Sequence, residues 1–583
     1  MMKSFLLSAC MVLGVGMLSF AQEPDSVRWD GNIDFHGASN HEYGGKVKVR
    51  SSGSRLRTVT DVDWGFIKNN ELHITRKESR QSGTHELDSL PKTKSDMKAT
   101  ASISAEYDIT SEDMVYASLS HHTAYGWSLI DGMVFPNIGV RRDLTNEEYN
   151  ERNLDLGLGY KRKLSSPGSL DFKLGGQIFS SRDSIHHENS SYNPEDIEAD
   201  TYTQYLRHLK NKKGNEIRFG GYYETPAFLD VENLHVTGHI GYVRNAVKDV
   251  QDSYYFDRIT GEWTYLPVLD VYYDFAGHLA DLSLDASYEY GRFAVSAFMD
   301  AQCYYRKLDE DSPVVEYENK PDTMRFSLVG NAKISYSFNE KNKLYLTYKR
   351  SISRPDYTQL TSYFQISDNL QEIVYGNRGL RNIGTDKLEL TYSHSGKRFG
   401  MDLCAGYRVT DGGIEKVLRK VDESIGYSEY YWMNTKTERD ITGNFDFFWK
   451  GEILRVSLKT YTGYKIISTN SGSPVKAFRY GADGDVAVNL PRDWSISGSF
   501  VYNSSDRKSY SKMDQYVSSS VGVSKIIAKR YKLSLALKDI FDHPMMTYSW
   551  DASSDSYEDA KERTMKTDYL NRRAVVAGFS FVF

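Results

Sequence analysis

Two pairs of adjacent histidines, His121-His122 and His186-His187, are the side chains of this sequence that most readily bind metal ions. Neighbouring side chains on a strand point to opposite faces, so an adjacent pair cannot place both rings on one ion unless the backbone turns there. The second pair lies in a polar stretch, residues 182–198, which favours solvated loop histidines. We therefore expect neither a metal ion nor a cofactor at these positions.

Other catalytic motifs are incomplete. His41-Glu42 and His85-Glu86 lack the second histidine of a zinc-protease helix. Gly157-Leu158-Gly159 lies within a strand-like stretch instead of preceding a helix, and the sequence contains no Gly-x-Ser-x-Gly nucleophile elbow. A triad assembled from distant residues on a barrel rim stays open as an alternative, but the sequence predicts a protein that is not an enzyme.

The acidic cluster Asp309-Glu310-Asp311 and the cysteines complete the chemically active side chains. We expect the acidic cluster in a solvated loop, with calcium or the cations that bridge lipopolysaccharide as an alternative. Cys303 has the apolar parity of its predicted strand and Cys404 the polar parity, which predicts that they form no disulfide.

The first residues read as a secretory signal. Lys3 precedes an apolar stretch from Phe5 to Leu18, and small residues stand at the −3 and −1 positions of a cleavage site between Ala21 and Gln22. A transmembrane anchor is the alternative, but the stretch is short and contains two glycines. We expect residues 1–21 to be removed and the chain to be exported.

Apolar and polar residues alternate with a period of two over most of the remaining chain. In the stretch from Phe293 to Arg306, one parity is apolar and the other is largely polar, which predicts a strand with one apolar and one polar face. Similar stretches are separated by turn residues at Gly291-Arg292, Asn339–Asn342, Ser395–Lys397, Gly451-Glu452, Pro491–Asp493 and Ala528–Arg530.

Two all-β architectures fit this alternation: a soluble sandwich and a transmembrane barrel. The strands are longer than the ~5–6 residues usual in soluble proteins, and short turns alternate with long polar connections such as Ser180–Asp200 and Ile352–Thr385. The chain also has 43 tyrosines, several of them near predicted strand ends, where a barrel places its aromatic girdles. These features favour a transmembrane barrel with short periplasmic turns and long outer loops.

The net charge of the chain is −6, which gives no general attraction for nucleic acid.

The C-terminus also fits a transmembrane barrel. The last stretch, Ala574 to Phe583, alternates and ends in Phe579, Phe581 and Phe583, which resembles the assembly signal that the barrel-assembly machinery of bacterial outer membranes recognises.

The number of alternating stretches predicts a large antiparallel barrel of about 22 strands, within a range of 20–24. The first is expected near Trp29–His36 and the last at Ala574–Phe583, and single-chain bacterial barrels have even strand numbers. Strand boundaries stay open in residues 22–95 and 245–277. We assign residues 22–583 to one barrel domain in the outer membrane, in contact with lipid and lipopolysaccharide.

Short motifs in the C-terminal half resemble the TonB-dependent-receptor-like barrel family. Ser353-Arg354-Pro355, followed by Tyr375-Gly376-Asn377, resembles the Ser-Arg-Pro and Gly-Asn-Pro-x-Leu-x-Pro-Glu segments of that family. Arg378 and Gly379 replace its Pro-x pair. Near the end, the segment Leu535–Asp542, which contains Asp539 and Phe541, is similar to the penultimate segment of the family.

The resemblance implies an outer-membrane transporter or receptor, in which a plug domain of ~130 residues usually fills the lumen. We find no plug signature and expect no plug domain. The loops Ile352–Thr385 and Met545–Thr567, an N-terminal segment, or a separate plug or surface lipoprotein would then fill or cap the lumen. The predicted function is passive or partner-assisted transport. The alternative is a surface receptor or assembly scaffold that does not transport. A barrel enzyme is the third hypothesis.

Overall fold

The computed structural model describes residues 28–79, 88–134, 140–164, 168–192, 202–225, 231, 233–311, 323–361, 364–366, 372–422, 427–468, 474–554, 556–568 and 573–583. The expected signal sequence with its cleavage site between Ala21 and Gln22, and the pair His85-Glu86, lie outside these residues. No helix in the described ranges is long and apolar enough to cross a membrane.

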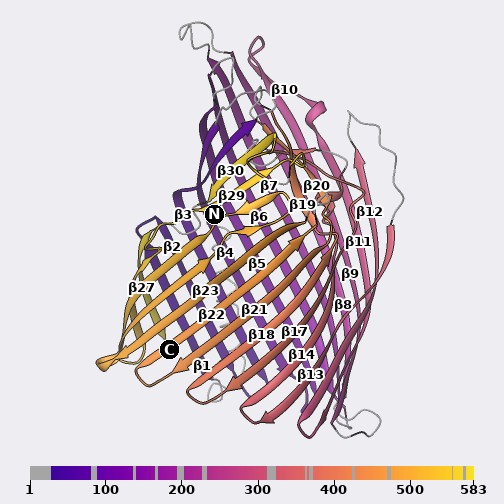
Figure 1. Cartoon of the computed structure of the whole chain (residues 1–583), viewed down its shortest axis with the longest axis vertical. Coiled ribbons are helices and arrows are strands. Elements are labelled where there is room, and N and C mark those ends of the chain that lie inside the picture. Colours follow the sequence, from indigo (N-terminus) through magenta and orange to yellow (C-terminus); the bar gives the residue numbers. More distant parts are fainter. Residues whose placement is uncertain are drawn as a thin grey trace.

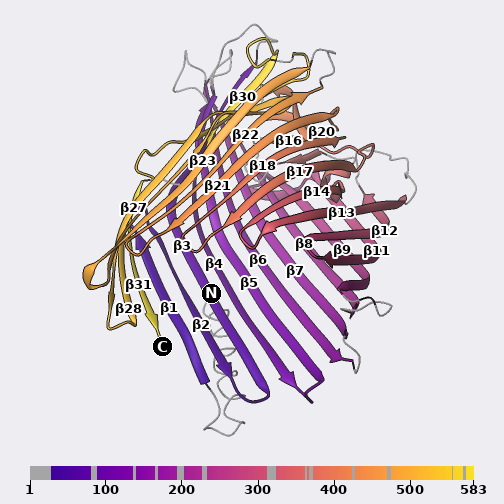
Figure 2. The ribbon, with the colours of Figure 1, turned by 60° about the horizontal axis from the view of Figure 1, so that its bottom comes forward.

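The described chain forms one closed antiparallel ring of 22 strands (Figures 1 and 2), as expected. Each strand pairs with its neighbours in the order of the sequence, and β1 pairs with β31 to close the ring. The ring strands are β1 (Arg28–Ala38), β2 (Glu42–Ser52), β3 (Leu56–Ser79), β4 (Asp88–Asp108), β5 (Asp113–Val134), β6 (Val140–Lys163), β7 (Ser169–Tyr192), β8 (Tyr202–Thr225), β9 (Leu234–Asp257), β11 (Val271–Tyr290), β12 (Phe293–Asp311), β13 (Thr323–Asn339), β14 (Asn342–Ser353), β17 (Ile383–Ser395), β18 (Phe399–Asp411), β21 (Glu438–Lys450), β22 (Leu454–Ile467), β23 (Val475–Leu490), β24 (Trp494–Asn503), β27 (Tyr516–Ile527), β28 (Tyr531–Lys538) and β31 (Ala574–Val582).

Alternation along each strand divides its side chains between the outside of the ring and the lumen. Leu282 on β11 and Phe326 on β13 point outward and are 64% and 76% exposed. Ser283, next to Leu282 on β11, and its cross-strand partner Asp300 on β12 face the lumen and are buried. The apolar face therefore meets lipid and the polar face lines the interior.

The six predicted turns connect the ring strands at the end that we assign to the periplasm. Gly291, between β11 and β12, has a φ of +59°, a conformation that glycine adopts at little cost. The longest connections, such as those between β14 and β17, β18 and β21, and β28 and β31, lie at the opposite, outer end, as expected for this class of barrel.

The N-terminal strands continue far beyond the membrane. β3 to β9 have 21 to 24 residues each, whereas a crossing needs ~9–11 (Figure 1). The expected outer loop Ser180–Asp200 is therefore wrong over much of its length, because β7 runs to Tyr192 and β8 begins at Tyr202. Outside the bilayer neither face of a strand contacts lipid. The alternation of apolar and polar residues therefore disappears there, although the backbone pairing of the strands continues.

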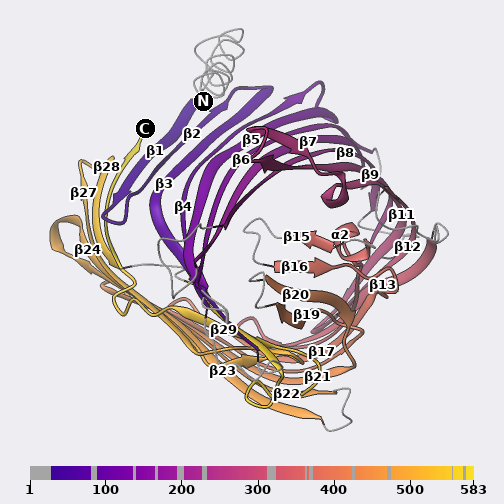
Figure 3. The same ribbon diagram turned by 90° about the horizontal axis from the view of Figure 1, so that it is seen from above.

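Two outer loops fold into the ring and build a small second sheet, which we call the inner sheet (Figure 3). The loop between β14 and β17 contributes helix α2 (Tyr357–Leu360), β15 (Phe364–Ile366) and β16 (Glu372–Tyr375). The loop between β18 and β21 contributes β19 (Ile414–Asp422) and β20 (Tyr427–Asn434), and β20 pairs with β16 in parallel. The described residues of the loop Ile352–Thr385, one of the segments expected to fill or cap the lumen, thus fold into the ring, and the contribution of the second loop was not foreseen.

Shorter elements complete the outer end. β10 (Glu262–Tyr265) pairs with β9 and leads to the 3-10 turn η3 (Pro267–Leu269). β25 (Asp506–Arg507) and β26 (Ser511–Met513) follow β24, and β29 (Met545–Trp550) and β30 (Glu562–Asp568) follow β28. β30 pairs with the outer part of β3, and β29 pairs with both β30 and β26. The expected loop Met545–Thr567 is thus largely a hairpin that joins the two ends of the chain above the seam.

Candidate functional site

Helix α2 anchors the inner sheet to the barrel wall. Asp356 caps the helix by accepting a hydrogen bond from the backbone N–H of Thr358 at 2.9 Å. Tyr357 stacks on Phe275 of β11 with ring centroids 5.4 Å apart, and Val247 of β9 completes the buried cluster. The helix therefore fixes the start of its loop against β9 and β11.

The motif residues Arg354 and Pro355 lie just before this helix. The guanidinium of Arg354 donates a hydrogen bond to Gln302 Oε1 at 2.6 Å and lies 4.8 Å from the ring centroid of Tyr304. Both partners belong to β12, and Pro355 is buried. Arg354 thus joins the loop to a third wall strand.

Gly376 and Asn377, the second pair of motif residues, hold the two loops of the inner sheet together. A Cβ at Gly376 would lie 2.2 Å from the carbonyl oxygen of Thr361, which leaves room for glycine alone. The Asn377 amide donates to the carbonyl oxygen of Trp432 at 3.0 Å and accepts from the backbone N–H of Gly379 at 2.8 Å. This arrangement places Trp432 of β20 next to β16.

Arg378, where the sequence departs from the family pattern, forms a buried ion pair. Its guanidinium lies 2.6 Å from the carboxylate of Glu310 on β12, and the two side chains are 15% and 0% exposed. The expectation that Asp309-Glu310-Asp311 lies in a solvated loop is therefore wrong. The cluster ends a long strand, and Glu310 points into the lumen, where the inner sheet covers it.

The opposite side of the inner sheet rests on the outer loops of the C-terminal strands. Val417 of β19 packs with Trp550, Tyr510 and Ala560 in a buried cluster. Glu562 of β30 accepts a hydrogen bond from the backbone N–H of Val421 at 2.9 Å. The inner sheet therefore spans the lumen from the β9–β12 wall to the hairpin formed by β29 and β30.

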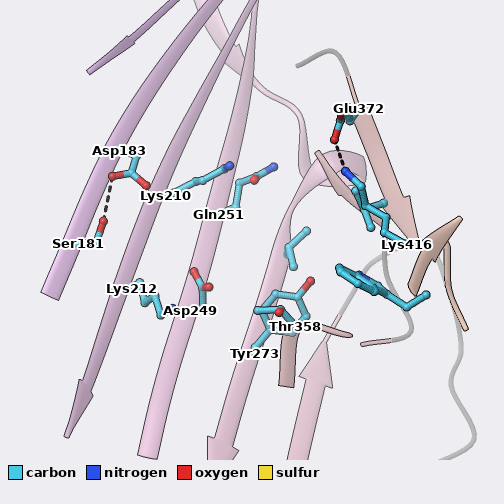
Figure 4. A pocket seen from close by; sticks show the side chains of 13 residues that line it. Ser181, Asp183, Lys210, Lys212, Asp249, Gln251, Tyr273, Thr358, Glu372 and Lys416 are labelled. Carbon is cyan, nitrogen blue, oxygen red and sulfur yellow. Dashed lines mark hydrogen bonds and ion pairs between the residues drawn. The ribbon is translucent and has the colours of Figure 1, made fainter. Parts of the chain in front are cut away.

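A cavity of about 420 Å³ lies between the wall and the inner sheet (Figure 4). On the wall side, lysines and carboxylates alternate across strands. Asp183 of β7 is the cross-strand neighbour of Lys210 on β8, and Lys212 is the neighbour of Asp249 on β9. Tyr273 of β11 adds an aromatic side chain. The wall thus offers charges of both signs.

The inner sheet supplies the facing side of the cavity. Lys416 of β19 is paired with Glu372 of β16 and lies 4.3 Å from the ring centroid of Tyr430. Thr358 of α2 and Trp432 of β20 complete this side. A solute in the cavity would touch the barrel wall and both folded-in loops together.

Tyr357 and Lys212 lie at one edge of this cavity, outside the lipid-facing belt. Burial raises the pKa of the Tyr357 phenol, and the nearby Asp249 and Asp356 raise it further, so the hydroxyl keeps its proton. The ammonium of Lys212 lies 5.3 Å from the Tyr357 ring centroid, in cation–π geometry. The edge therefore presents one cation over a neutral ring.

The two histidine pairs lie on β5 and β7, and none of the four side chains lines this cavity. His122 faces the lumen, with Nδ1 2.9 Å from Thr100 Oγ1. His187 is buried 2.8 Å from Thr145 Oγ1, so the expectation that the second pair is solvated in a loop is wrong for this residue. No group of three or more His, Cys, Asp or Glu side chains within the described ranges is placed to hold a metal ion.

The remaining candidate residues, the two cysteines and the motif residues Asp539 and Phe541, lie elsewhere in the barrel. Cys303 and Cys404 are free thiols on different strands, and Cys404 lies 3.6 Å from Glu389 Oε1 in the lumen. Asp539 is buried just after β28 with a φ of +48°, and Phe541 is exposed. None of these residues reaches the cavity between the wall and the inner sheet.

The terminal phenylalanines form the seam of the ring. Phe579 pairs with Phe35 and Phe581 with Ile33 across the junction of β31 and β1. Phe583 exchanges two backbone hydrogen bonds with Gly31, at 3.0 and 3.1 Å. The residues expected to direct assembly are thus the ones that close the barrel.

A comparison with known protein families finds a match over most of the chain. Residues 174–573 match the family described as "Outer membrane protein beta-barrel family". The comparison with curated proteins gives no match.

Solved structures share the fold at low identity. The copper transporter OprC is 12% identical, with a TM-score of 0.64, and the match covers 96% of this chain and 81% of OprC. The ferripyoverdine receptor of Pseudomonas aeruginosa is 10% identical, with a TM-score of 0.62, and 96% and 72% of the two chains are covered. BauA, the ferric preacinetobactin receptor of Acinetobacter baumannii, is 11% identical, with a TM-score of 0.57 and coverage of 95% and 80%. The resemblance drawn from the motifs is confirmed at the level of fold.

Proposed function

The chain belongs to the outer membrane protein beta-barrel family and is a transporter-like barrel of the outer membrane, and on that premise we propose that it binds and takes up a small solute that carries charges of both signs. The solute would bind in the cavity between the wall and the inner sheet. The observation that carries this proposal is the composition of that cavity, which combines three lysines, three carboxylates and the aromatic side chains of Tyr273 and Trp432.

The size and the position of the cavity support the proposal. Ligand pockets commonly have volumes of ~300–1,000 Å³, and this one measures about 420 Å³. The charged side chains of the wall have opposite charges as cross-strand neighbours, so a zwitterionic solute can exchange these contacts for its own without leaving a charge uncompensated.

Uptake then requires the inner sheet to move. The sheet is tied to β12 through Arg378 and Glu310, and to the outer hairpin through Val421 and Glu562. We infer that these ties keep the lumen closed at rest, and that solute binding or a partner protein releases them. A separate plug or surface lipoprotein is a partner of that kind. Catalysis is not part of this proposal.

A binding experiment with a defined probe tests the cavity. We would titrate the purified barrel with the zwitterionic dipeptide lysyl-aspartate and follow tryptophan fluorescence, with sucrose as an uncharged probe of comparable size. The dipeptide should change the fluorescence and sucrose should not. Trp432→Phe should remove the signal, and Lys210→Gln with Lys416→Gln should weaken the binding. Equal responses to both probes would contradict the charged-solute proposal.

A second experiment separates transport from reception alone. Single-channel recording in planar bilayers should show a barrel that is mostly closed, with conductance that rises when Arg378 is changed to Ala. If the dipeptide binds but neither the wild-type chain nor this variant conducts, the protein is a surface receptor without transport.

A further inference from the structure

We propose that the outside of the barrel binds a phosphate-bearing lipid of the outer leaflet, at an apolar groove on β9, β11, β12 and β13 that is bordered on its outer side by basic side chains of β8 and β9. This site is separate from the lumen and does not depend on the proposed uptake function.

The groove has a floor of small side chains. Ala280 of β11 and Cys303 of β12 are direct cross-strand neighbours, and the same row continues to Tyr242 of β9 on one side and Phe326 of β13 on the other. These larger residues form the rims of a depression of about 770 Å³ within the lipid-facing belt. Apolar side chains line almost all of it, so it suits a hydrocarbon chain.

The groove lies at the outer edge of the apolar belt. The next row toward the outside contains Arg244, His278 and Tyr305, and the Tyr242 hydroxyl lies 2.8 Å from Nδ1 of His278. Tyrosine and charged side chains mark the level at which hydrocarbon gives way to headgroups. A chain in this groove therefore belongs to a lipid of the outer leaflet, whose headgroup would lie next to Arg244.

Two further cations lie closer to the outer end of the barrel than Arg244. Lys213 of β8 and Lys248 of β9 are direct cross-strand neighbours on the outward face, and both are exposed. Lys248 has the exposed Asp274 of β11 as its other cross-strand neighbour, and its ammonium lies 5.0 Å from the ring centroid of Tyr272. Lys213 and Lys248 are still like charges directly opposite each other, an arrangement that is destabilising and that an added anion would relieve. Over the described part of the chain, no carboxylate forms an ion pair with Lys213, Lys248 or Arg244.

The spacing of these groups fits one lipid. Lys248 and Arg244 are four residues apart on one face of β9, or ~13 Å along the strand, and Tyr242 lies a further ~7 Å below. A phosphate-bearing headgroup can thus bridge the three cations while one of its acyl chains enters the groove. Phosphate is a strong acceptor for both arginine and lysine.

A second copy of the chain is a less suitable occupant. A two-fold dimer through this groove would be isologous, so it would bring the same patch of each subunit together. Lys213, Arg244 and Lys248 outnumber the neighbouring carboxylate of Asp274, so two copies of the patch would bring together surfaces of the same net charge. The charge of the patch favours an anionic lipid over self-association.

Native mass spectrometry of the delipidated barrel tests the site with two probes that differ only in charge. The probes are lipid A and the same lipid A after removal of its phosphates. The wild-type chain should retain lipid A and hold the dephosphorylated form about tenfold more weakly, the size expected for the loss of charge-assisted hydrogen bonds. Lys213→Gln with Lys248→Gln, and Arg244→Gln, should each reduce this preference.

Groove variants complete the test. Ala280→Trp fills the groove and should abolish retention of both probes, whereas Ala297→Trp, on the same lipid-facing surface but outside the groove, should not. Lys476→Gln, on the outward face of β23, is the control for the charge variants. Ala280→Leu repeats the groove test with a smaller change if the tryptophan variant does not fold. Equal retention of both probes, equal loss in Ala280→Trp and Ala297→Trp, or a dimer that Ala280→Trp converts to monomer would overturn the proposal.

Discussion

The guanidinium of Arg378 and the carboxylate of Glu310 meet at 2.6 Å inside the barrel, although 68 residues separate them in the sequence. Arg378 belongs to a folded-in loop and Glu310 to the wall strand β12, so this single contact ties a movable part of the molecule to a rigid one. It also gives a reason for arginine at the position where the sequence departs from the motif of related barrels.

Breaking this pair should loosen the inner sheet. Removing one partner of a buried ion pair typically costs ~3–5 kcal/mol because the other charge stays buried without compensation. We therefore expect Arg378→Ala to raise the open probability in planar bilayers and to speed proteolysis of the loop between β14 and β17. Arg378→Ala combined with Glu310→Ala should recover part of this loss, because no uncompensated charge remains.

Arg350→Ala serves as the matched control. Arg350 pairs with Asp386 at 3.3 Å, but both side chains are largely exposed, and such pairs contribute only ~0–1 kcal/mol. This variant should leave conductance and proteolysis at the wild-type level. An effect as large as that of Arg378→Ala would mean that the buried pair is not the tie we infer.

The assignment of faces on β12 can be tested at adjacent residues. Ala297 is exposed on the lipid-facing side, between Ala286 and Ala332 of the neighbouring strands, whereas Ser296 faces the lumen. Ala297→Arg should lower the free energy of unfolding in vesicles by ~2–4 kcal/mol, the cost of a cation at mid-bilayer. Ser296→Arg should have a much smaller effect, and equal effects would contradict the assignment.

The seam should depend on Phe583. Its backbone exchanges hydrogen bonds with Gly31 at 3.0 and 3.1 Å, and a Cβ at Gly31 would lie 2.6 Å from the Phe583 ring. Deletion of Phe583 should slow membrane assembly, measured by the appearance of the heat-modifiable folded form on gels. Phe583→Ala keeps the backbone bonds and should assemble faster than the deletion. Normal assembly of the deletion variant would weaken the role given to the C-terminus.

The ring was predictable because strand alternation is local. The parity of residues 293–306 predicts the outward position of Cys303, and turn residues such as Gly291 mark where β11 and β12 meet. No long-range information is needed for either inference, since a closed antiparallel ring pairs each strand with its sequence neighbours.

The interior was harder to predict because its contacts are distant in sequence. Glu310 lies in an acidic run that is typical of a solvated loop, and only its pairing with Arg378 reveals a buried strand end. β19 and β20 lie in a second polar connection, and they form a sheet only by pairing with β16 from another loop. The cavity is built from these contacts, so its residues carried no signal of their own.

His208 illustrates the same difficulty in the outer extension of the wall. It lies on β8 above the lipid-facing belt, is almost fully buried, and has Nδ1 2.9 Å from Ser253 Oγ. Burial, together with the nearby Lys210 and His187, lowers the pKa of His208 from the usual 6.5 to about 4. The folded protein therefore holds this imidazole neutral at pH values where the unfolded chain would protonate it.

This difference predicts a loss of local stability in acid. Above pH 6.5 both states are neutral at His208 and the penalty is absent, whereas between pH 6.5 and about 4 only the unfolded state takes up the proton. The free energy of opening the outer parts of β8 and β9 should fall by roughly 3 kcal/mol across that window, measured by amide hydrogen exchange. His208→Gln should flatten the dependence, and His41→Asn, at an exposed turn, should retain it. A wild-type profile that is flat from pH 7 to 4 would refute the neutral buried imidazole.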